Sequence, residues 1–126
     1  MAGKNFLHLN DIGSYKIAFN LSNVIWKLIM GWDYLSKDTI GKQFIRSTDS
    51  ISANIAEGFG RHGKKDKIKF YYYSMGSVKE SFDWNEKSFR RNLLTNIQYK
   101  YIFNELNKLP IEINMLIKFT REKLTI

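Results

Sequence analysis

Three polar side chains that could take part in chemistry recur at helical spacing in the middle of the chain. They are the amide of Asn54, the carboxylate of Glu57 and the guanidinium of Arg61. Steps of three and four residues place them on one face of a helix and its end. Small residues surround this polar seam where a helix normally carries Leu or Ile, so a second helix can approach it closely. These small residues are Ser47, Ser50, Ser52, Ala53 and Ala56.

A second carboxylate, Glu80, raises the possibility of acid–base chemistry together with Glu57. Gly76 precedes Ser77 and Glu80, which share one face of a later helix, and Gly76 itself would let that helix come close. In an antiparallel pair this face could meet Asn54 and Glu57, and two carboxylates on neighbouring helices can serve as general acid and base. We favour a structural interpretation, in which a half-buried polar network fixes the helix register. The seam's arginine or a neighbouring subunit would then neutralise the acids.

The glycine-rich stretch after the seam resembles phosphate-binding loops. Gly58, Gly60 and Gly63 match the pattern G-x-G-x-x-G. With Lys64 they nearly match the P-loop pattern, which requires Ser or Thr where Lys65 stands. Both motifs need a preceding β-strand to aim the loop, and the sequence predicts no strand here. We therefore interpret Gly58 as a helix-ending glycine followed by a flexible turn.

Basic residues gather around this turn and favour an anionic partner. The candidates for phosphate contacts are Arg61, Lys64, Lys65, Lys67 and Lys69, with Tyr73 as a neighbouring ring on which a base could stack. The first turn of the following helix also presents free N–H groups, which attract anions. The alternative is a solvated basic face beside tyrosines that pack in the core or in an interface.

Other reaction types lack the residues that they need. The chain has no cysteine, which excludes zinc–thiolate sites, disulfides and cysteine nucleophiles. Neither His8 nor His62 follows a glutamate at the three-residue spacing of di-iron bundles, and neither lies in a recognisable nucleophile context. We therefore expect no catalytic residue, no metal and no cofactor.

The composition is that of a basic protein of one domain. The chain has 126 residues and a net charge of +8, and residues 61–92 carry nine basic residues against four acidic ones. This uneven distribution suits a polyanion such as RNA. The start of the chain lacks a secretion signal, and no apolar stretch approaches the ~20 residues that span a bilayer. We expect a cytoplasmic protein without a membrane partner.

Apolar residues at intervals of three and four predict four helices, at residues 13–32, 37–58, 65–91 and 96–123. Ser14, Ser36 and Thr95 are candidate N-terminal caps. The short connections require antiparallel neighbours, so we predict that the whole chain forms one all-α domain, an up-down-up-down four-helix bundle. Pro110 should kink the fourth helix or split it, because proline lacks the N–H that a helix interior uses.

More large apolar side chains are present than one inward-facing row per helix requires. The first and third helices supply the surplus: Tyr15, Phe19, Trp26, Met30, Phe70, Tyr73 and Trp84. A helix that is apolar on more than one face is usually covered by another chain, which predicts a homo-oligomer. Alternatively, these aromatic residues cap the ends of the bundle and line its loops.

Two motifs carry a family resemblance. Residues 50–61 read Ser-Ile-x-Ala-Asn-Ile-Ala-Glu-Gly-x-Gly-Arg, residues 76–80 read Gly-Ser-x-x-Glu, and the pair Tyr15-Lys16 also fits. Over nearly its whole length the chain resembles the small four-helix-bundle proteins encoded by intervening sequences in bacterial 23S rRNA genes. The resemblance implies a bundle that assembles as a ring, commonly a pentamer, with a basic surface. Similar accessory proteins of diversity-generating retroelements work beside a reverse transcriptase and nucleic acid.

These observations lead to two functional hypotheses. The first is a non-enzymatic, oligomeric protein that binds structured or single-stranded RNA through its basic residues. The second is a scaffold whose polar seam and aromatic faces dock another protein, such as a polymerase or reverse transcriptase. An enzyme ranks third, because no group of residues has the arrangement that a reaction needs.

Overall fold

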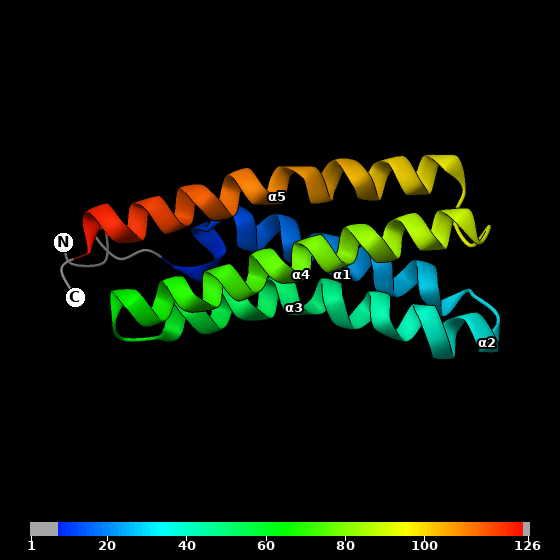
Figure 1. The fold of residues 1–126 in the computed structure, drawn as a ribbon, viewed down its shortest axis with the longest axis horizontal. Coiled ribbons are helices and arrows are strands. Elements are labelled where there is room, and N and C mark those ends of the chain that lie inside the picture. The colour runs from blue at the N-terminus through cyan, green and yellow to red at the C-terminus, as the bar shows by residue number, and fades with distance from the viewer. Residues whose placement is uncertain (1–7, 125–126) are drawn as a thin grey trace.

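The computed structural model describes residues 8–124, and all regular structure within them is helical. The long helices lie side by side along one axis (Figure 1): α1 (Gly13–Met30), α3 (Lys42–Gly60), α4 (Lys64–Arg90) and α5 (Asn96–Lys123). The shorter elements are the 3-10 turn η2 (Leu9–Asp11), the single turn α2 (Tyr34–Ser36) and the π-helical segment η3 (Lys37–Gly41). The prediction of an all-α four-helix bundle is confirmed.

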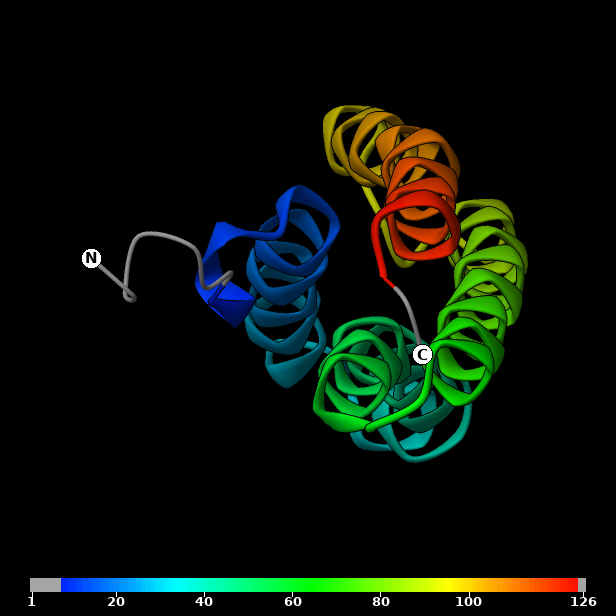
Figure 2. The ribbon, with the colours of Figure 1, turned by 90° about the vertical axis from the view of Figure 1, so that its left-hand side faces the viewer.

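Viewed along the axis, consecutive long helices are neighbours (Figure 2). α3 and α4 make the most extensive contact in the bundle, and α1 and α5 close it with a less extensive one. The core is filled by apolar residues from all four helices. Its largest fully buried members are Leu21, Ile25, Ile29, Phe44, Ile51, Ile55, Tyr71, Ile102, Leu106, Leu109, Ile113 and Ile117.

Small polar residues let α3 and α4 pack closely, as the sequence predicts. The hydroxyls of Ser47 and Ser81 lie 2.9 Å apart and hydrogen-bond across the interface. The Ser74 hydroxyl donates to the backbone carbonyl of Ile51 at 2.8 Å. All of these groups are buried, so each bond satisfies a polar atom that would otherwise be costly to bury. Together they fix the register between the two helices.

The second long helix begins earlier than predicted. α2, η3 and α3 form one continuous helical run that starts at Tyr34. The carboxylate of Asp33 accepts a hydrogen bond from the backbone N–H of Ser36 at 3.1 Å and so caps this run. The prediction that Ser36 is the cap is therefore wrong, since Ser36 already lies within the first turn.

The other two predicted caps have opposite outcomes. Thr95 caps α5 as predicted, through reciprocal hydrogen bonds with Gln98. Ser14 does not cap α1, because the helix already begins at Gly13. The hydroxyl of Ser14 is buried and has no hydrogen-bond partner among the described residues. α5 runs through Pro110 as one helix, so the proline does not split it, and Figure 1 shows the helix following a gently curved path.

Candidate nucleic-acid interface

Arg61 directly follows α3 and is held by two carboxylates and a ring. Its guanidinium nitrogens lie 2.9 Å from a carboxylate oxygen of Glu57 and 3.5 Å from one of Asp66. The same group lies over the ring of Phe70, 4.5 Å from its centroid. The predicted neutralisation of Glu57 by Arg61 is confirmed. Arg61 thus joins the end of α3 to the start of α4, and a phosphate would have to compete with both acids.

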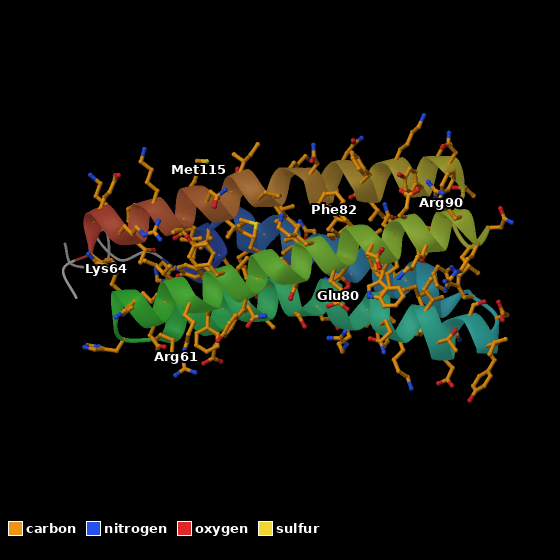
Figure 3. The ribbon with its side chains drawn as sticks, in the orientation of Figure 1. Arg61, Lys64, Glu80, Phe82, Arg90 and Met115 are labelled. Atoms are coloured by element: carbon orange, nitrogen blue, oxygen red, sulfur yellow. The ribbon has the colours of Figure 1, made fainter. Side chains whose placement is uncertain are left out.

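Two of the predicted cations bind the carboxyl ends of neighbouring helices. The ammonium of Lys64 donates to the Arg121 carbonyl of α5 at 2.9 Å, and that of Lys67 donates to the Phe59 carbonyl of α3 at 2.7 Å. Such carbonyls lack helical donors and carry partial negative charge, which an ammonium offsets. Burial lowers the pKa of Lys67. Figure 3 shows Lys64 and Arg61 at the same end of the bundle, where these bonds tie three helices together.

The remaining predicted residues differ in how freely they face solvent. Lys69 forms an ion pair with Asp66 at 3.2 Å. Tyr73 is half exposed and meets the ring of Phe70 edge-on, with centroids 5.3 Å apart. Lys65 is exposed and forms no ion pair with any residue between 8 and 124. The structure therefore brings the predicted cations together, but most of them already have partners.

Gly58 has a different role from the one predicted. α3 continues past it to Gly60, so the interpretation of Gly58 as a helix-ending glycine is wrong. A Cβ at Gly58 would lie 2.7 Å from the Tyr71 ring and 2.9 Å from the Lys67 carbonyl oxygen, both on α4. The glycine therefore permits the close approach of α4. No strand precedes the loop in the described part of the chain, so the phosphate-loop patterns lack the element that they need.

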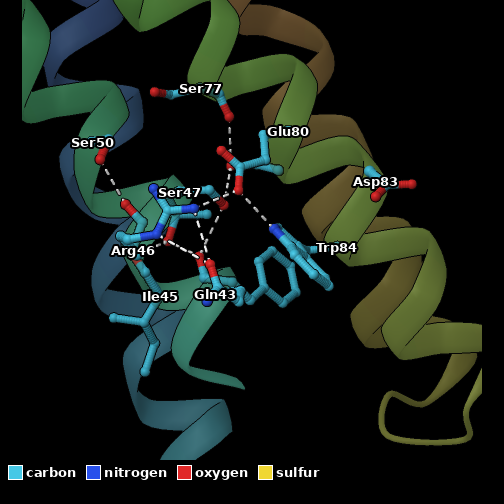
Figure 4. A network of polar contacts seen from close by, with 12 residues as sticks. Gln43, Ile45, Arg46, Ser47, Ser50, Ser77, Glu80, Asp83 and Trp84 are labelled. Carbon is cyan, nitrogen blue, oxygen red and sulfur yellow. Dashed lines mark hydrogen bonds and ion pairs between the residues drawn. The ribbon is translucent and has the colours of Figure 1, made fainter. Parts of the chain in front are cut away.

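Glu80 belongs to a separate polar network, displaced along α3 from Glu57. Its carboxylate accepts hydrogen bonds from the Arg46 guanidinium at 2.7 Å and from the Trp84 indole at 3.0 Å (Figure 4). The register of α3 against α4 places Glu80 opposite Arg46. The expected meeting of Glu80 with Glu57 is therefore wrong, and each carboxylate is neutralised by its own arginine.

The other polar residues of the two motifs bond within their own helices. The Asn54 amide donates to the Ser50 carbonyl at 2.9 Å, and the Ser77 carbonyl accepts from the Ser81 hydroxyl at 2.8 Å. Gly76 is exposed, and a Cβ there would meet no atom within 4 Å. The expectation that Gly76 lets another helix of the same chain come close is therefore wrong.

Several cations without ion-pair partners lie on the outer side of α4 and α5, and others, such as Lys16 and Lys27, lie on α1. Within residues 8–124, no acidic side chain pairs with Lys65, Lys79, Lys100, Lys118 or Arg121. The Arg121 guanidinium donates a hydrogen bond to the Tyr72 hydroxyl at 3.1 Å, which places the surface of α5 around Arg121 beside α4. Figure 3 shows side chains with nitrogen tips projecting from α5 along its length. We call the surface formed by these cations and the exposed amides between them, Asn104, Asn107 and Asn114, the α4–α5 face.

Helical spacing of like residues is the sequence feature that could have located this face. Lys, Asn, Asn, Asn, Lys and Arg stand at positions 100, 104, 107, 114, 118 and 121, all exposed and at steps of three, four or seven. Two glutamates of α5 lie on the other side. Glu112 lies against Gly13 of α1, and Glu105, two turns earlier, pairs with Lys108. Between Lys100 and Arg121 the row on the α4–α5 face therefore contains no acidic residue, and the exposed Glu122 follows it, one turn after Lys118.

One group of exposed apolar side chains lies on α1 and on the side of α5 that faces it: Phe19, Trp26, Met30, Met115 and Phe119, each about half exposed. Others are exposed on α4 and elsewhere on α5, among them Tyr72, Tyr73, Tyr101, Phe103 and Ile111. Trp26 and Met30 border a hollow of about 310 Å³ that Ile45 of α3 also lines. Part of the predicted outer row of α1 is thus open to solvent, and its burial by a second copy remains a prediction.

Neither a metal site nor a membrane-spanning helix is found among the described residues. No group of three or more His, Asp or Glu side chains between residues 8 and 124 is placed to hold a metal ion. None of the helices in that part of the chain combines the length and the apolar character that crossing a bilayer requires.

Comparison with known proteins agrees with this architecture. A crystal structure of a protein of unknown function from Bacteroides thetaiotaomicron, described as from the S23 ribosomal protein family, superposes with a TM-score of 0.74. The likeness covers 83% of this chain and 98% of that chain at 24% sequence identity, which shows a shared fold. Comparison with curated proteins finds no match. The sequence matches the family model over residues 10–115, and the chain therefore belongs to the 23S rRNA-intervening sequence protein family.

Proposed function

We propose that this protein is a non-enzymatic, homo-oligomeric, cytoplasmic protein that associates with RNA. One observation carries the proposal: five cations that pair with no described carboxylate share the α4–α5 face, whereas the unpaired lysines of α1, Lys16 and Lys27, lie elsewhere. A cation that already binds a carboxylate must exchange that partner for a phosphate, whereas an unpaired one exchanges only water. The family name connects its members with 23S rRNA, which makes RNA the first polyanion to consider.

Salt dependence tests the RNA association directly. Purified protein, freed of co-purifying nucleic acid by nuclease and high salt, is titrated into labelled RNA while fluorescence anisotropy is measured. Neutralised phosphates release counterions, so the logarithm of the binding constant should fall linearly with the logarithm of the salt concentration. If neither RNA nor DNA is retained even at low salt, the proposal is wrong.

The pairing of both motif carboxylates supports a role without catalysis. Glu57 is bound by Arg61 and Glu80 by Arg46, so each acid is engaged with a guanidinium. Paired carboxylates in such networks commonly fix helix register. A hydrolase or transferase activity that disappears in folded Glu57→Gln or Glu80→Gln protein would contradict this part of the proposal.

The exposed apolar side chains of α1 and α5 support self-association. Apolar surface of this kind is usually covered in an assembly, and the family resemblance favours a ring of five. Light scattering coupled to gel filtration should then give about five times the chain mass of 14.9 kDa. A mass of one chain at micromolar concentration would overturn the prediction of an oligomer.

A scaffold for another protein is the second candidate function. The hollow beside Trp26, Met30 and Ile45 is the observation that favours it, because an apolar hollow can accept a side chain of a partner. Co-purification from the native cell distinguishes the two candidates. A polymerase or other protein that remains bound after nuclease treatment would favour the scaffold, and a partner released together with the nucleic acid would favour RNA association.

A further inference from the structure

We propose that the α4–α5 face binds double-stranded RNA, with its lysines and arginine on phosphates and its asparagines on the 2′-hydroxyls of the minor groove. This inference rests on the proposed RNA association and names the class of RNA. It is carried by the shape of the face, by the order of residues along it and by an exposed glycine.

The shape of the α4–α5 face suits a duplex better than a single strand. Lys100 and Lys118 are separated by eighteen residues of one unbroken helix, about 27 Å along its axis. The hollows at the bundle ends and beside α1 are lined by residues outside this face. A single strand needs a groove and free ring faces on which its bases stack. A convex helical surface instead fits the wide, shallow minor groove of an A-form duplex.

The rings near this face already have partners. The hydroxyl of Tyr72 accepts a hydrogen bond from Arg121 at 3.1 Å. Phe103 meets the Phe82 ring edge-on, with centroids 5.5 Å apart. The hydrogen bond leaves the half-exposed Tyr72 ring open to a base, but one open ring is fewer than the successive rings on which a single strand stacks.

The order of residues along α5 matches the chemistry of an A-form minor groove. Cations stand at both ends of the row, and Asn104, Asn107 and Asn114 stand between them, with Ile111, which is 66% exposed, between the last two. A side-chain amide both donates and accepts hydrogen bonds, as does a 2′-hydroxyl, whereas an ammonium only donates and prefers phosphate oxygens. No acidic residue stands within the row between Lys100 and Arg121, and the one that follows it, Glu122, is next to Arg121. Amides between two charged ends are therefore suited to distinguish RNA from DNA.

Gly76 gives independent support from the adjacent helix. A glycine in the middle of α4 weakens that helix, and packing within the chain does not require it, because a Cβ there would meet no atom within 4 Å. It lies one turn from both Tyr72 and Lys79 on the outer surface of α4. A missing side chain at this point lets a bulky partner come close to the helix backbone.

The experiment compares three probes of one sequence: an RNA duplex of about 20 base pairs, the DNA duplex and the single RNA strand. Three double variants are titrated against each probe by anisotropy. Lys100→Gln/Lys118→Gln removes the charged ends of the row. Asn107→Ala/Asn114→Ala removes amides from exposed helix positions where Ala favours folding. Lys16→Gln/Lys27→Gln removes two equally exposed and unpaired lysines of α1 as the matched control.

The wild-type protein should bind the RNA duplex about tenfold more tightly than the other two probes, because only that duplex presents 2′-hydroxyls in an A-form groove. The lysine variant should lower the slope of log K against log salt by about two, one for each phosphate that is no longer neutralised. The asparagine variant should keep that slope and lose the preference for RNA over DNA. The control pair should change neither quantity beyond a uniform weakening.

Four results would overturn the proposal, and only the first also refutes RNA association. Failure to bind any of the three probes refutes both duplex binding and the proposed RNA association. Equal or tighter binding of the single strand refutes the duplex. An equal loss of slope in the Lys16/Lys27 control refutes the location. Displacement of the duplex by polyglutamate at matched charge shows a general polyanion surface and refutes recognition of the duplex through its 2′-hydroxyls, while association with RNA through charge stands. An asparagine variant that keeps its preference for RNA refutes the role of the amides, while binding at the face stands on the lysine result.

Discussion

Replacing Gly58 by alanine tests the closest approach between α3 and α4. The added Cβ would lie 2.7 Å and 2.9 Å from two ring carbons of Tyr71 and 2.9 Å from the carbonyl oxygen of Lys67. The ring is buried and the carbonyl is backbone, so neither can move aside unless α4 shifts. Overpacking of this kind costs about 1–3 kcal/mol. This cost is offset by up to about 1 kcal/mol, because alanine has a higher helix propensity than glycine. The middle of the overpacking range less the helix term leaves an expected net loss of about 1 kcal/mol.

Gly76→Ala is the matched control, because the substitution is the same and α4 is also a helix. No atom lies within 4 Å of a Cβ at Gly76, so only the helix preference should act. The expected result is a gain of about 0.5–1 kcal/mol. Urea unfolding followed by far-UV circular dichroism gives both values. Each variant is measured at two protein concentrations, since self-association makes apparent stability depend on concentration.

The critical result is that the two substitutions change the free energy of unfolding in opposite directions, lower for Gly58→Ala and higher for Gly76→Ala. A Gly58→Ala protein as stable as wild type, or more stable, would show that α4 does not approach α3 as closely as described. A loss of stability in Gly76→Ala that grows with protein concentration would show that another copy packs on Gly76. That outcome would place the subunit interface, rather than RNA, on the outer surface of α4.

Three further changes test other contacts. Lys67→Met should lower the free energy of unfolding by about 1 kcal/mol, seen as a lower urea midpoint, because the Phe59 carbonyl loses its donor. Glu80→Gln should cost at most about 0.5 kcal/mol, since its ion pair is largely exposed, but should change the fluorescence of Trp84. Partial desolvation raises the pKa of Asp49, although the residue stays solvent-exposed, so this carboxyl favours folding below its ordinary pKa of 3.8 and loses that small contribution as the pH rises through the raised value. Asp49→Asn should therefore stabilise the fold at about pH 7 and not at about pH 3; an equal gain at both would contradict the assignment.

Apolar periodicity is sufficient to place the long helices, because each has an inward row that only a 3.6-residue repeat can produce. It does not fix where the second helix begins. Asp33 and Ser36 are both good caps and stand three residues apart, so local chemistry does not choose between them. The structure chooses Asp33, whose carboxylate accepts the hydrogen bond from the Ser36 backbone N–H, and the run that starts there packs Gly41 against Ile29 of α1. Residue types at the two positions do not reveal this choice.

The contacts of the polar seam also depend on the register of α4 along α3, which the sequence of either helix alone does not fix. Spacing correctly predicts the pair of Glu57 and Arg61, since both lie at the end of one helix. Whether Glu80 meets that pair or Arg46 depends on how far α4 slides along α3. The same register decides that Gly58 is buried while Gly76 is exposed, although both residues interrupt a helix in the same way. Spacing within one helix therefore predicts contacts along it and not contacts across it.

The residues that identify the family and the residues proposed to bind RNA are largely different, for a physical reason. Glu57, Gly58 and Arg61 form the joint between α3 and α4, where Arg61 pairs with Glu57 and Asp66 and Gly58 leaves room for the Tyr71 ring. Such residues produce a recognisable motif because the fold requires them. A phosphate contact requires the opposite, a cation such as Lys118 with no partner to give up. Its position is set only by the face of the helix, so a search for function in this family should begin with unpaired surface cations.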